Sequence, residues 1–345
     1  MTDFVSLDEI RAARERVRGV ARVTPILEVP WPAFAAAPQE RHDVAAATAG
    51  KPASARGESR HSLFLKAENL QPMGAFKIRG AFNMLAQIPP EDLRRGVITY
   101  SSGNHGQAVA LAAQTLGAPA VIVMPTTATS VKVEGARGYG AEVIFEGTTS
   151  LHRQARAERE AEARGLTMVP PFDHRMIIAG QGTVGLEILE QRPDVSTVFV
   201  PVGGGGLASG AAAALKQSKP GIRVVAVEPE GAPKMTRSLA AGHPITLDSS
   251  STIADGLMNL RPGSITFEHV RALVDEVVTV SDEAIAKAVG WLSRNARLVV
   301  EPSGAATTAA VMLGLGGADP SRGSVVAIVS GGNVAPEALA KYLTA

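Results

Sequence analysis

Short apolar runs alternate with helical stretches along most of the chain, and this alternation limits the possible fold more than any other feature. The runs that resemble buried strands are 63–66, 96–100, 120–124, 141–145, 197–201, 223–228, 276–280 and 324–330. Helical stretches between them are predicted at about 76–87, from about 106, and at 131–139 and 150–164. Strands that alternate with helices predict parallel sheets, which bind ligands beyond the carboxyl ends of their strands. The segments that follow strands are therefore the candidate binding segments.

The length of 345 residues predicts two α/β domains, because so long a chain does not fit one small core. Breaks near residues 90 and 170 enclose one compact unit. We expect a small domain at 91–172 and a large domain formed by 1–90 with 173–345. A first helix is predicted to begin at Ser6, which forms a capping-box pattern with Glu9. Residues 33–61 are rich in Ala, Pro, Gly and charge without an apolar period, which is typical of a mobile surface insertion.

The composition excludes several classes of function. The formal net charge is +1 and charged residues make up 19% of the chain, so neither a nucleic-acid nor a membrane surface is indicated. No apolar run reaches the roughly 18 residues of a membrane span. The chain has no cysteine, which excludes disulfides, thiolate metal sites and thiol catalysis and is compatible with a reducing cytoplasm. A small neutral or zwitterionic ligand fits this balance.

Four consecutive glycines, Gly203 to Gly206, join the apolar run TVFVPV to the helical stretch ASGAAAAL. Glycines at such a turn let backbone N–H groups and a helix N-terminus approach an anion, which predicts a phosphate site. The turn alone does not name the ligand. Gly203, Gly205 and Ala208 also fit the pattern G-x-G-x-x-A, and Glu228 ends the next strand, so a nicotinamide enzyme is an alternative.

Lys77 argues against a dinucleotide. It lies at a predicted helix start in the segment PMGAFKIRG, among small and apolar residues. Loss of solvent around a lysine lowers its pKa and makes it nucleophilic. A solvated surface lysine is the simpler interpretation of this position taken alone.

Two more segments follow predicted strands. Ser101-Ser102-Gly103-Asn104-His105 offers hydroxyls, an amide and N–H groups to a carboxylate, although a plain helix cap has the same composition. We expect His105 to be structural and not a base. Ser330 ends the last strand before two glycines and Asn333, and by itself indicates only a turn.

Taken together, the segments resemble one known family. The motifs are GAFKIRG, SSGNHGQA, IAGQGTVGLEIL, GGGGL, ADGLMNLRPGSITF, EPSGAATTAA and SGGN. In this order they resemble the serine racemase and threonine dehydratase family, over nearly the whole chain outside 33–61. The resemblance implies the pyridoxal 5′-phosphate (PLP) fold type II, similar to tryptophan synthase β. Such a fold has two α/β domains, each an open, mostly parallel sheet flanked by helices.

The resemblance also implies roles for single residues. Lys77 carries PLP as a Schiff base, with Phe76 beside it. Asn104 lies against the ring hydroxyl and Ser330 binds the pyridine nitrogen. The phosphate is held by Gly203, Gly204, Gly205, Gly206 and Leu207. The substrate carboxylate is received by Ser101, Ser102, Gly103, Asn104 and His105.

The implied activity is an ammonia-lyase that converts threonine, serine or 3-hydroxyaspartate to a 2-keto acid and ammonia. Lys77 removes the Cα proton and PLP accepts the electrons. The Ser330 hydroxyl, unlike a carboxylate, does not hold the ring nitrogen protonated, which favours loss of the β-hydroxyl over transamination.

Racemisation is the alternative within the family, and it needs acid–base groups on both faces of Cα. Lys77 and Ser102 are the candidate catalytic pair, because the racemase branch has S-S-G-N-H where many dehydratases have S-A-G-N-H. Arg153 falls where racemase-like members carry an arginine, and it can bind a distal carboxylate such as that of 3-hydroxyaspartate. In the simpler interpretation, Ser102 only binds the α-carboxylate and Arg153 is a surface residue.

At several positions this sequence differs from the family pattern, and these differences change what we expect of metal binding and substrate. Glu228 and Ala232 fall where some members bind a divalent cation, but Lys234 replaces the expected Asp, so we predict no metal there. The segments 173–175 and 33–61 leave room for a dehydratase of a bulkier or modified hydroxy amino acid. We also expect a cytoplasmic homodimer. The sequence ends at Ala345 without an added C-terminal domain, so feedback regulation of the biosynthetic dehydratase kind is not expected.

Overall fold

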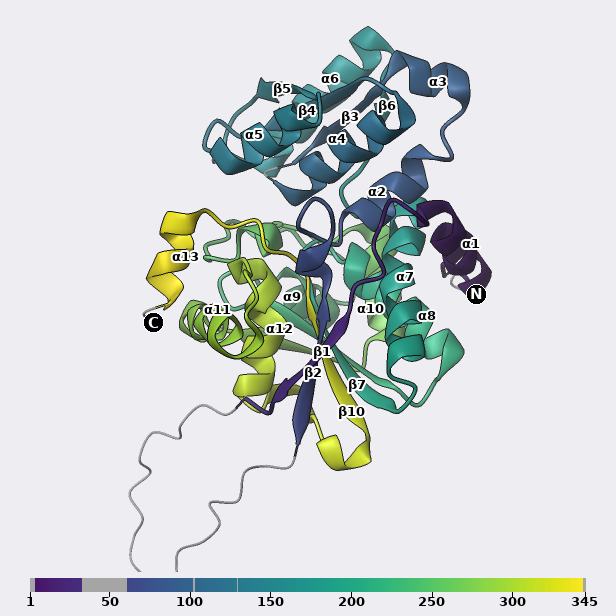
Figure 1. Ribbon diagram of the computed structural model, residues 1–345. Coiled ribbons are helices and arrows are strands. Elements are labelled where there is room, and N and C mark those ends of the chain that lie inside the picture. Colours follow the sequence, from purple (N-terminus) through teal and green to yellow (C-terminus); the bar gives the residue numbers. More distant parts are fainter. Residues whose placement is uncertain (1–3, 33–60, 102, 129, 344–345) are drawn as a thin grey trace, which may run out of the picture.

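The computed structural model describes residues 4–32, 61–101, 103–128 and 130–343, which form two sheets with helices packed against them (Figure 1). The larger sheet has six strands in the order β1-β2-β10-β7-β8-β9. Their bounds are Ile26–Pro30, Ser62–Ala67, Ser324–Val329, Val195–Pro201, Arg223–Pro229 and Glu276–Val280. The smaller sheet has four strands in the order β5-β4-β3-β6, with bounds Glu142–Phe145, Ala120–Met124, Val97–Tyr100 and Thr167–Met168.

The predicted parallel α/β architecture is confirmed. Every strand pair is parallel except β1 with β2, which are antiparallel at the edge of the larger sheet. The interior strands are buried on both faces, which explains why they are continuous apolar runs without alternation.

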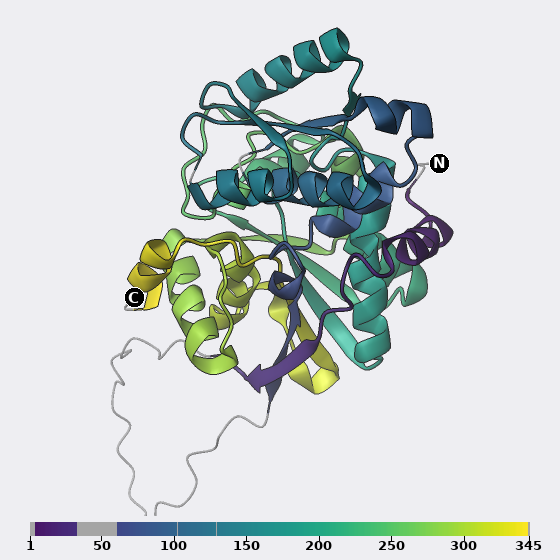
Figure 2. The same cartoon turned by 45° about the horizontal axis from the view of Figure 1, so that its top comes forward.

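Helices cover both faces of the larger sheet. In Figure 1, α1, α7, α8 and α10 lie to one side of it and α11 and α12 to the other, and the turned view in Figure 2 keeps this division. The helix bounds are α1 Leu7–Val17, α2 Ile78–Leu85, α3 Pro90–Arg95, α4 Asn104–Leu116, α5 Ser130–Gly138, α6 Ser150–Arg164, α7 Arg175–Gln191, α8 Gly206–Ser218, α9 Lys234–Ala241, α10 Ser264–Leu273, α11 Asp282–Ala296, α12 Pro302–Met312 and α13 Pro336–Leu343. Short 3-10 turns lie at Glu68–Leu70, Asp255–Leu257, Leu315–Gly317 and Pro320–Arg322.

The apolar core follows these layers. One cluster packs α11 and α12 against the larger sheet, and a second packs α7, α8 and α10 against its other face. A third joins α2 and α4 to the smaller sheet. All eleven residues of α12 are buried, so this helix lies in the interior against the larger sheet.

Most predicted elements lie within one or two residues of their observed bounds. The capping box of Ser6 and Glu9 is confirmed. β1 and β6 were not predicted, because β1 is a partly exposed edge strand next to prolines and β6 has only two residues. The predicted insertion at 33–61 lies outside the described residues, apart from His61.

In the described part of the chain, no helix has the length and apolarity needed to cross a bilayer.

Candidate active site

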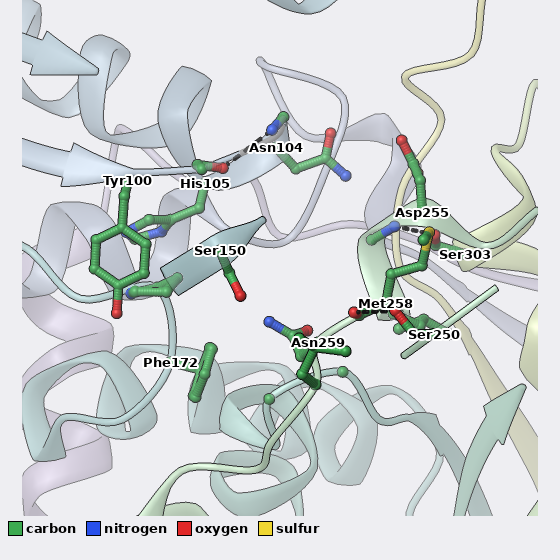
Figure 3. A pocket seen from close by; sticks show the side chains of 18 of the residues that line it. Tyr100, Asn104, His105, Ser150, Phe172, Ser250, Asp255, Met258, Asn259 and Ser303 are labelled. Atoms are coloured by element: carbon green, nitrogen blue, oxygen red, sulfur yellow. Dashed lines mark hydrogen bonds between the residues drawn. The ribbon is translucent and has the colours of Figure 1, made fainter. Parts of the chain in front are cut away.

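Segments that follow strands of both sheets line one cavity of about 550 Å³. Ser101 follows β3, Gly203 follows β7 and Ser330 follows β10, as expected for a site beyond the carboxyl ends of parallel strands. Figure 3 shows Asn104 and Tyr100 on one side of the cavity and Met258 and Asn259 on another. The volume lies in the range of small-molecule sites.

Lys77 places its ammonium group in this cavity. The residue is the N-cap of α2, and its Nζ donates a hydrogen bond of 2.7 Å to the Pro171 carbonyl oxygen. The same nitrogen lies 5.2 Å from the centre of the Phe76 ring. Desolvation lowers the pKa of Lys77 to about 8. The free, nucleophilic amine is therefore a minor form at pH 7 and the main form above about pH 8.

The four glycines form the turn that starts α8. Gly205 is the N-cap of the helix and has a φ of 102°, which favours glycine. A Cβ on Gly204 would overlap the Phe172 ring, and one on Gly203 would lie 2.8 Å from Asn259 Oδ1. The first-turn N–H groups of α8 have no partner within the helix. The turn and the helix end therefore form a cradle for an anion at the cavity wall.

The Ser101–His105 segment divides between cavity wall and core. Ser101 Oγ accepts a hydrogen bond of 3.1 Å from Gly103 N, and Ser102 lies outside the described residues. Asn104 begins α4 and is held on both sides of its amide, since its Nδ2 donates to Glu301 Oε1 (2.5 Å) and its Oδ1 accepts from Asn333 Nδ2 (2.9 Å). The orientation of the Asn104 amide is therefore fixed.

His105 is 3% exposed, and its Nε2 lies 3.2 Å from the Val169 carbonyl oxygen. A carbonyl accepts only, so Nε2 carries the proton. Burial, with a smaller contribution from Lys77, lowers the pKa of His105 to about 3. The ring is neutral at physiological pH, which agrees with a structural role.

Ser330 brings the last strand to the cavity. It is 4% exposed, and its carbonyl oxygen accepts a hydrogen bond of 3.1 Å from Phe76 N. An isolated antiparallel bridge between Ala75 and Gly331 lies beside this contact. The Lys77 segment and the Ser330 segment, distant in sequence, are therefore neighbours.

Comparison with known proteins decides the family. Residues 51–331 match the pyridoxal-phosphate dependent enzymes. The L-threonine ammonia-lyase of Thermotoga maritima is 46% identical over 79% of this chain and 67% of its own length. The serine racemase of Schizosaccharomyces pombe is 37% identical over 98% and 97% of the two chains. The solved structure of maize serine racemase superposes with a TM-score of 0.84 at 37% identity, covering 99% of this chain and 98% of that one.

The chain belongs to the pyridoxal-phosphate dependent enzymes. It has the fold type II architecture that the sequence predicts. The residues present fit PLP: the glycine turn leaves the end of α8 open to a phosphate, and the Lys77 amine of lowered pKa lines the same cavity. The nicotinamide alternative is set aside because this family match includes the glycine turn.

Glu301 is a site residue for which the sequence analysis gave no role. It is the N-cap residue of α12 and is 2% exposed, and its Oε2 is buried without a hydrogen-bond partner in the described part of the chain. Burial, with a smaller contribution from Asp255, raises the pKa of Glu301 to about 7. The motif EPSGA offered a signal, because an acid directly before a helix-starting proline is typical of a helix N-terminus.

A second pair without a predicted role closes one side of the cavity. Lys132 on α5 forms an ion pair with Asp255, which begins the 3-10 turn at 255–257. Lys132 is 7% exposed, and its side chain packs under Gly103. This contact joins the smaller-sheet unit to the larger one next to the predicted carboxylate-binding segment.

Arg153 is buried at the cavity wall and not on the surface. It is 8% exposed, its Nη1 donates a hydrogen bond of 3.2 Å to the Thr148 carbonyl oxygen, and its Nε is buried without a hydrogen-bond partner among the described residues. Burial lowers the pKa of Arg153 and raises that of nearby Tyr100 to about 12. A guanidinium held in this way can accept an anionic group from the cavity.

Residues 173–175, which depart from the family pattern, contact the ends of neighbouring helices. Asp173 accepts hydrogen bonds from the first N–H groups of α10, and His174 caps α7. Arg175 pairs with Glu9 of α1. The three side chains hold helix ends, and they do not belong to the residues that line the cavity within the described chain.

Proposed function

We propose that this enzyme is a PLP-dependent ammonia-lyase of β-hydroxy amino acids, acting on L-threonine, L-serine or 3-hydroxyaspartate. One observation carries the proposal: a buried amine, a glycine turn at a helix N-terminus and the Ser101–His105 segment at another helix N-terminus face the same cavity. The ammonia-lyase and deaminase names of relatives support it.

The chain's residues then have these assignments. Lys77 would hold the PLP aldehyde, Phe76 would lie beside it, and Gly203 to Leu207 would hold the phosphate. Asn104 would face the ring hydroxyl and Ser330 the ring nitrogen. Bound PLP supplies an electron sink for a carbanion at Cα.

Substrate binding is assigned to the α4 end of the cavity. The α-carboxylate would bind at the N-terminus of α4, where the helix dipole favours an anion. The residues that would receive it are Ser101, Ser102, Gly103, Asn104 and His105. Lys77 Nζ, released when the substrate amine takes its place on PLP, would take the Cα proton, and its lowered pKa of about 8 suits it to this role. The neutral Ser330 hydroxyl would leave negative charge near Cα, which favours departure of the β-hydroxyl.

Arg153 would select for a second carboxylate. Its buried guanidinium lies on α6 near the cavity, and Ser150 points into the cavity from the start of the same helix (Figure 3). An acidic substrate such as 3-hydroxyaspartate would supply a partner for its Nε–H, which has none among the described residues.

Amino acid racemisation is the second candidate. It is supported by the match with the Schizosaccharomyces pombe serine racemase over 98% of this chain and 97% of its own length. In this case Ser102 would serve the face of Cα opposite Lys77.

A panel assay separates the candidates. Keto acid and ammonia release would be measured with both enantiomers of serine and threonine and with threo and erythro 3-hydroxyaspartate, and the change in enantiomer ratio would be followed by chiral chromatography. Keto acid release that is lost in Lys77→Ala establishes the lyase. Enantiomer exchange without keto acid establishes the racemase. If the PLP-loaded enzyme gives no signal in either assay, its substrate is a different one, such as a bulkier hydroxy amino acid.

We further propose that the two sheets mark two domains, 91–172 and 1–90 with 173–345, since the strands of the smaller sheet all fall between residues 97 and 168.

We also propose a homodimer, because two-fold dimers are the commonest assembly, and a cytoplasmic location. Light scattering and cell fractionation test these two points.

A further inference from the structure

Lys234 is a fully buried lysine surrounded by oxygen atoms. It begins α9 and is 0% exposed. Its Nζ donates to the carbonyl oxygens of Val202 (2.9 Å), Leu257 (3.0 Å) and Ala232 (3.2 Å) and lies 3.4 Å from Glu228 Oε2. Three carbonyls and a carboxylate are the kind of ligands that a hard cation takes in proteins. Here the chain's own ammonium group holds that position.

Burial lowers the pKa of Lys234 and the neighbouring Glu228 opposes this shift, so the hydrogen bonds decide the form that we assign, and their number favours the charged one. An ammonium has three N–H bonds, and three carbonyl oxygens accept them, whereas a neutral amine has only two to donate. Beside the ammonium, the fully buried Glu228 accepts hydrogen bonds from Met235 N (3.0 Å) and Thr236 N (2.8 Å). Glu228 is therefore fixed by the first turn of α9, and it fixes Lys234 in turn.

Two of the three carbonyls belong to segments that line the active-site cavity. Val202 directly precedes Gly203, and Leu257 ends the 3-10 turn that leads to Met258 and Asn259, which face the cavity in Figure 3. The two walls touch, since a Cβ on Gly203 would lie 2.8 Å from Asn259 Oδ1 and 3.0 Å from the Gly256 carbonyl oxygen. The ammonium group thus joins the glycine turn to the 255–259 segment from behind.

A divalent metal does not fit beside this side chain. The Nζ fills the space between the same oxygens, and its positive charge repels a second cation. The described residues contain no cluster of three or more His, Cys, Asp or Glu side chains suited to a metal ion.

We propose that Lys234 is a positioning residue whose ammonium acts as a built-in cation, holding the glycine turn and the 255–259 segment in the arrangement that binds the PLP phosphate. The enzyme therefore needs no dissolved cation at this place. Removing the side chain should convert it into an enzyme that depends on one. The inference rests on the PLP site of the proposed function but not on the identity of the substrate.

The test compares holoenzymes of wild type, Lys234→Ala and Lys234→Met. The dissociation constant of PLP and the melting temperature would be measured with ammonium, methylammonium, potassium or magnesium chloride. Tetramethylammonium chloride at equal ionic strength serves as a cation too large to enter. The methionine variant is the matched control, because it fills the space without supplying charge or hydrogen bonds.

We expect wild type to be insensitive to the cation. In tetramethylammonium, Lys234→Ala should bind PLP roughly tenfold more weakly or worse, which corresponds to about 1.4 kcal/mol. A small cation should restore most of this loss in the alanine variant and none of it in the methionine variant. Unchanged PLP affinity in Lys234→Ala, or a loss that no small cation reverses, overturns the proposal.

If Lys234→Ala folds only when a small cation is present, that result supports the proposal. If it does not fold under any condition, Lys234→Gln replaces it, since glutamine keeps N–H donors but lacks the charge. PLP affinity equal to wild type in Lys234→Gln overturns the proposal, and weaker affinity supports it. Failure of the substrate panel would leave these PLP titrations unaffected, so the two failures can be told apart.

Discussion

Asn104 donates a hydrogen bond of 2.5 Å to Glu301, although 197 positions separate the two residues in the chain. The first residue of α4, which packs on the smaller sheet, is thereby tied to the N-cap of α12, which is buried against the larger one. The bond orients the Asn104 amide toward the cavity that both sheets line.

Replacing Glu301 by glutamine should remove a pH dependence of stability. The folded-state pKa of Glu301, about 7, lies above its ordinary value of 4.5. The folded protein binds this proton more tightly than the unfolded chain, so the free energy of unfolding falls as the pH rises from about 4.5 to 7. The full effect is on the order of 3 kcal/mol. Urea unfolding of the PLP-free protein should show that, as the pH rises across this range, the free energy of unfolding of Glu301→Gln increases relative to that of wild type. Parallel stability curves would contradict the assignment.

Capture of PLP by Lys77 should accelerate as the pH rises through about 8. The lowered pKa of Lys77 means that the free amine, which attacks the aldehyde, becomes the main form above this value. Stopped-flow absorbance after mixing PLP-free enzyme with PLP measures the rate. Lys77→Ala should show no covalent capture at any pH. The rate should level off above this pH, and a rate that still rises about tenfold per pH unit between pH 9 and 10 would contradict a lowered pKa.

Loss of Arg79 should destabilise the fold strongly. Arg79 lies two residues after Lys77 and is 1% exposed. Its guanidinium pairs with Glu68 (2.8 Å) and Glu187 (2.6 Å). Arg79→Met leaves both carboxylates without this partner, at a cost of about 3–5 kcal/mol. The control is Arg14→Met, whose exposed pair with Glu190 contributes about 0–1 kcal/mol. Denaturant unfolding of both variants gives the comparison, and equal losses would show that burial of the Arg79 network has no special weight.

Arg153 should decide between acidic and neutral substrates. Arg153→Gln is expected to lower kcat/KM for 3-hydroxyaspartate by roughly 30-fold or more, equivalent to about 2 kcal/mol of charge-assisted hydrogen bonding, with a small effect on serine. Arg156 lies on the same helix but pairs with Glu146 and Glu160 away from the cavity, so Arg156→Gln is the matched control. Equal losses with serine and 3-hydroxyaspartate would assign Arg153 to the fold and not to substrate selection.

A methyl group at Gly204 should disturb the phosphate cradle. Its Cβ would overlap the Phe172 ring, which packs directly on the turn. We expect Gly204→Ala to weaken PLP binding by roughly tenfold or more, as for a loss of about 1.4 kcal/mol. Gly221→Ala is the control, because a Cβ there meets no atom within 4 Å among the described residues. Spectroscopic PLP titration measures both variants, and unchanged affinity in Gly204→Ala would show that Phe172 yields without cost.

The sequence by itself determined the architecture and the segments of the site. Buried parallel strands must be apolar on both faces, and residues such as Lys77, Gly203 and Ser330 must follow strands or start helices, so both leave a local signal. Most of the candidate residues could therefore be named before their distances were known. The resemblance to a family rests on the same local segments.

Only the tertiary structure decided which groups meet. The Asn104–Glu301 bond and the approach of the Val202 and Leu257 carbonyls to Lys234 depend on residues far apart in the chain, and the burial of Arg153 depends on how its helix packs. The pKa of Glu301 rises and that of Lys77 falls because packing removes water from them, which no local pattern records. The sequence determines which side chains are available, and the packing of the sheets and helices decides the charge and the partners of each.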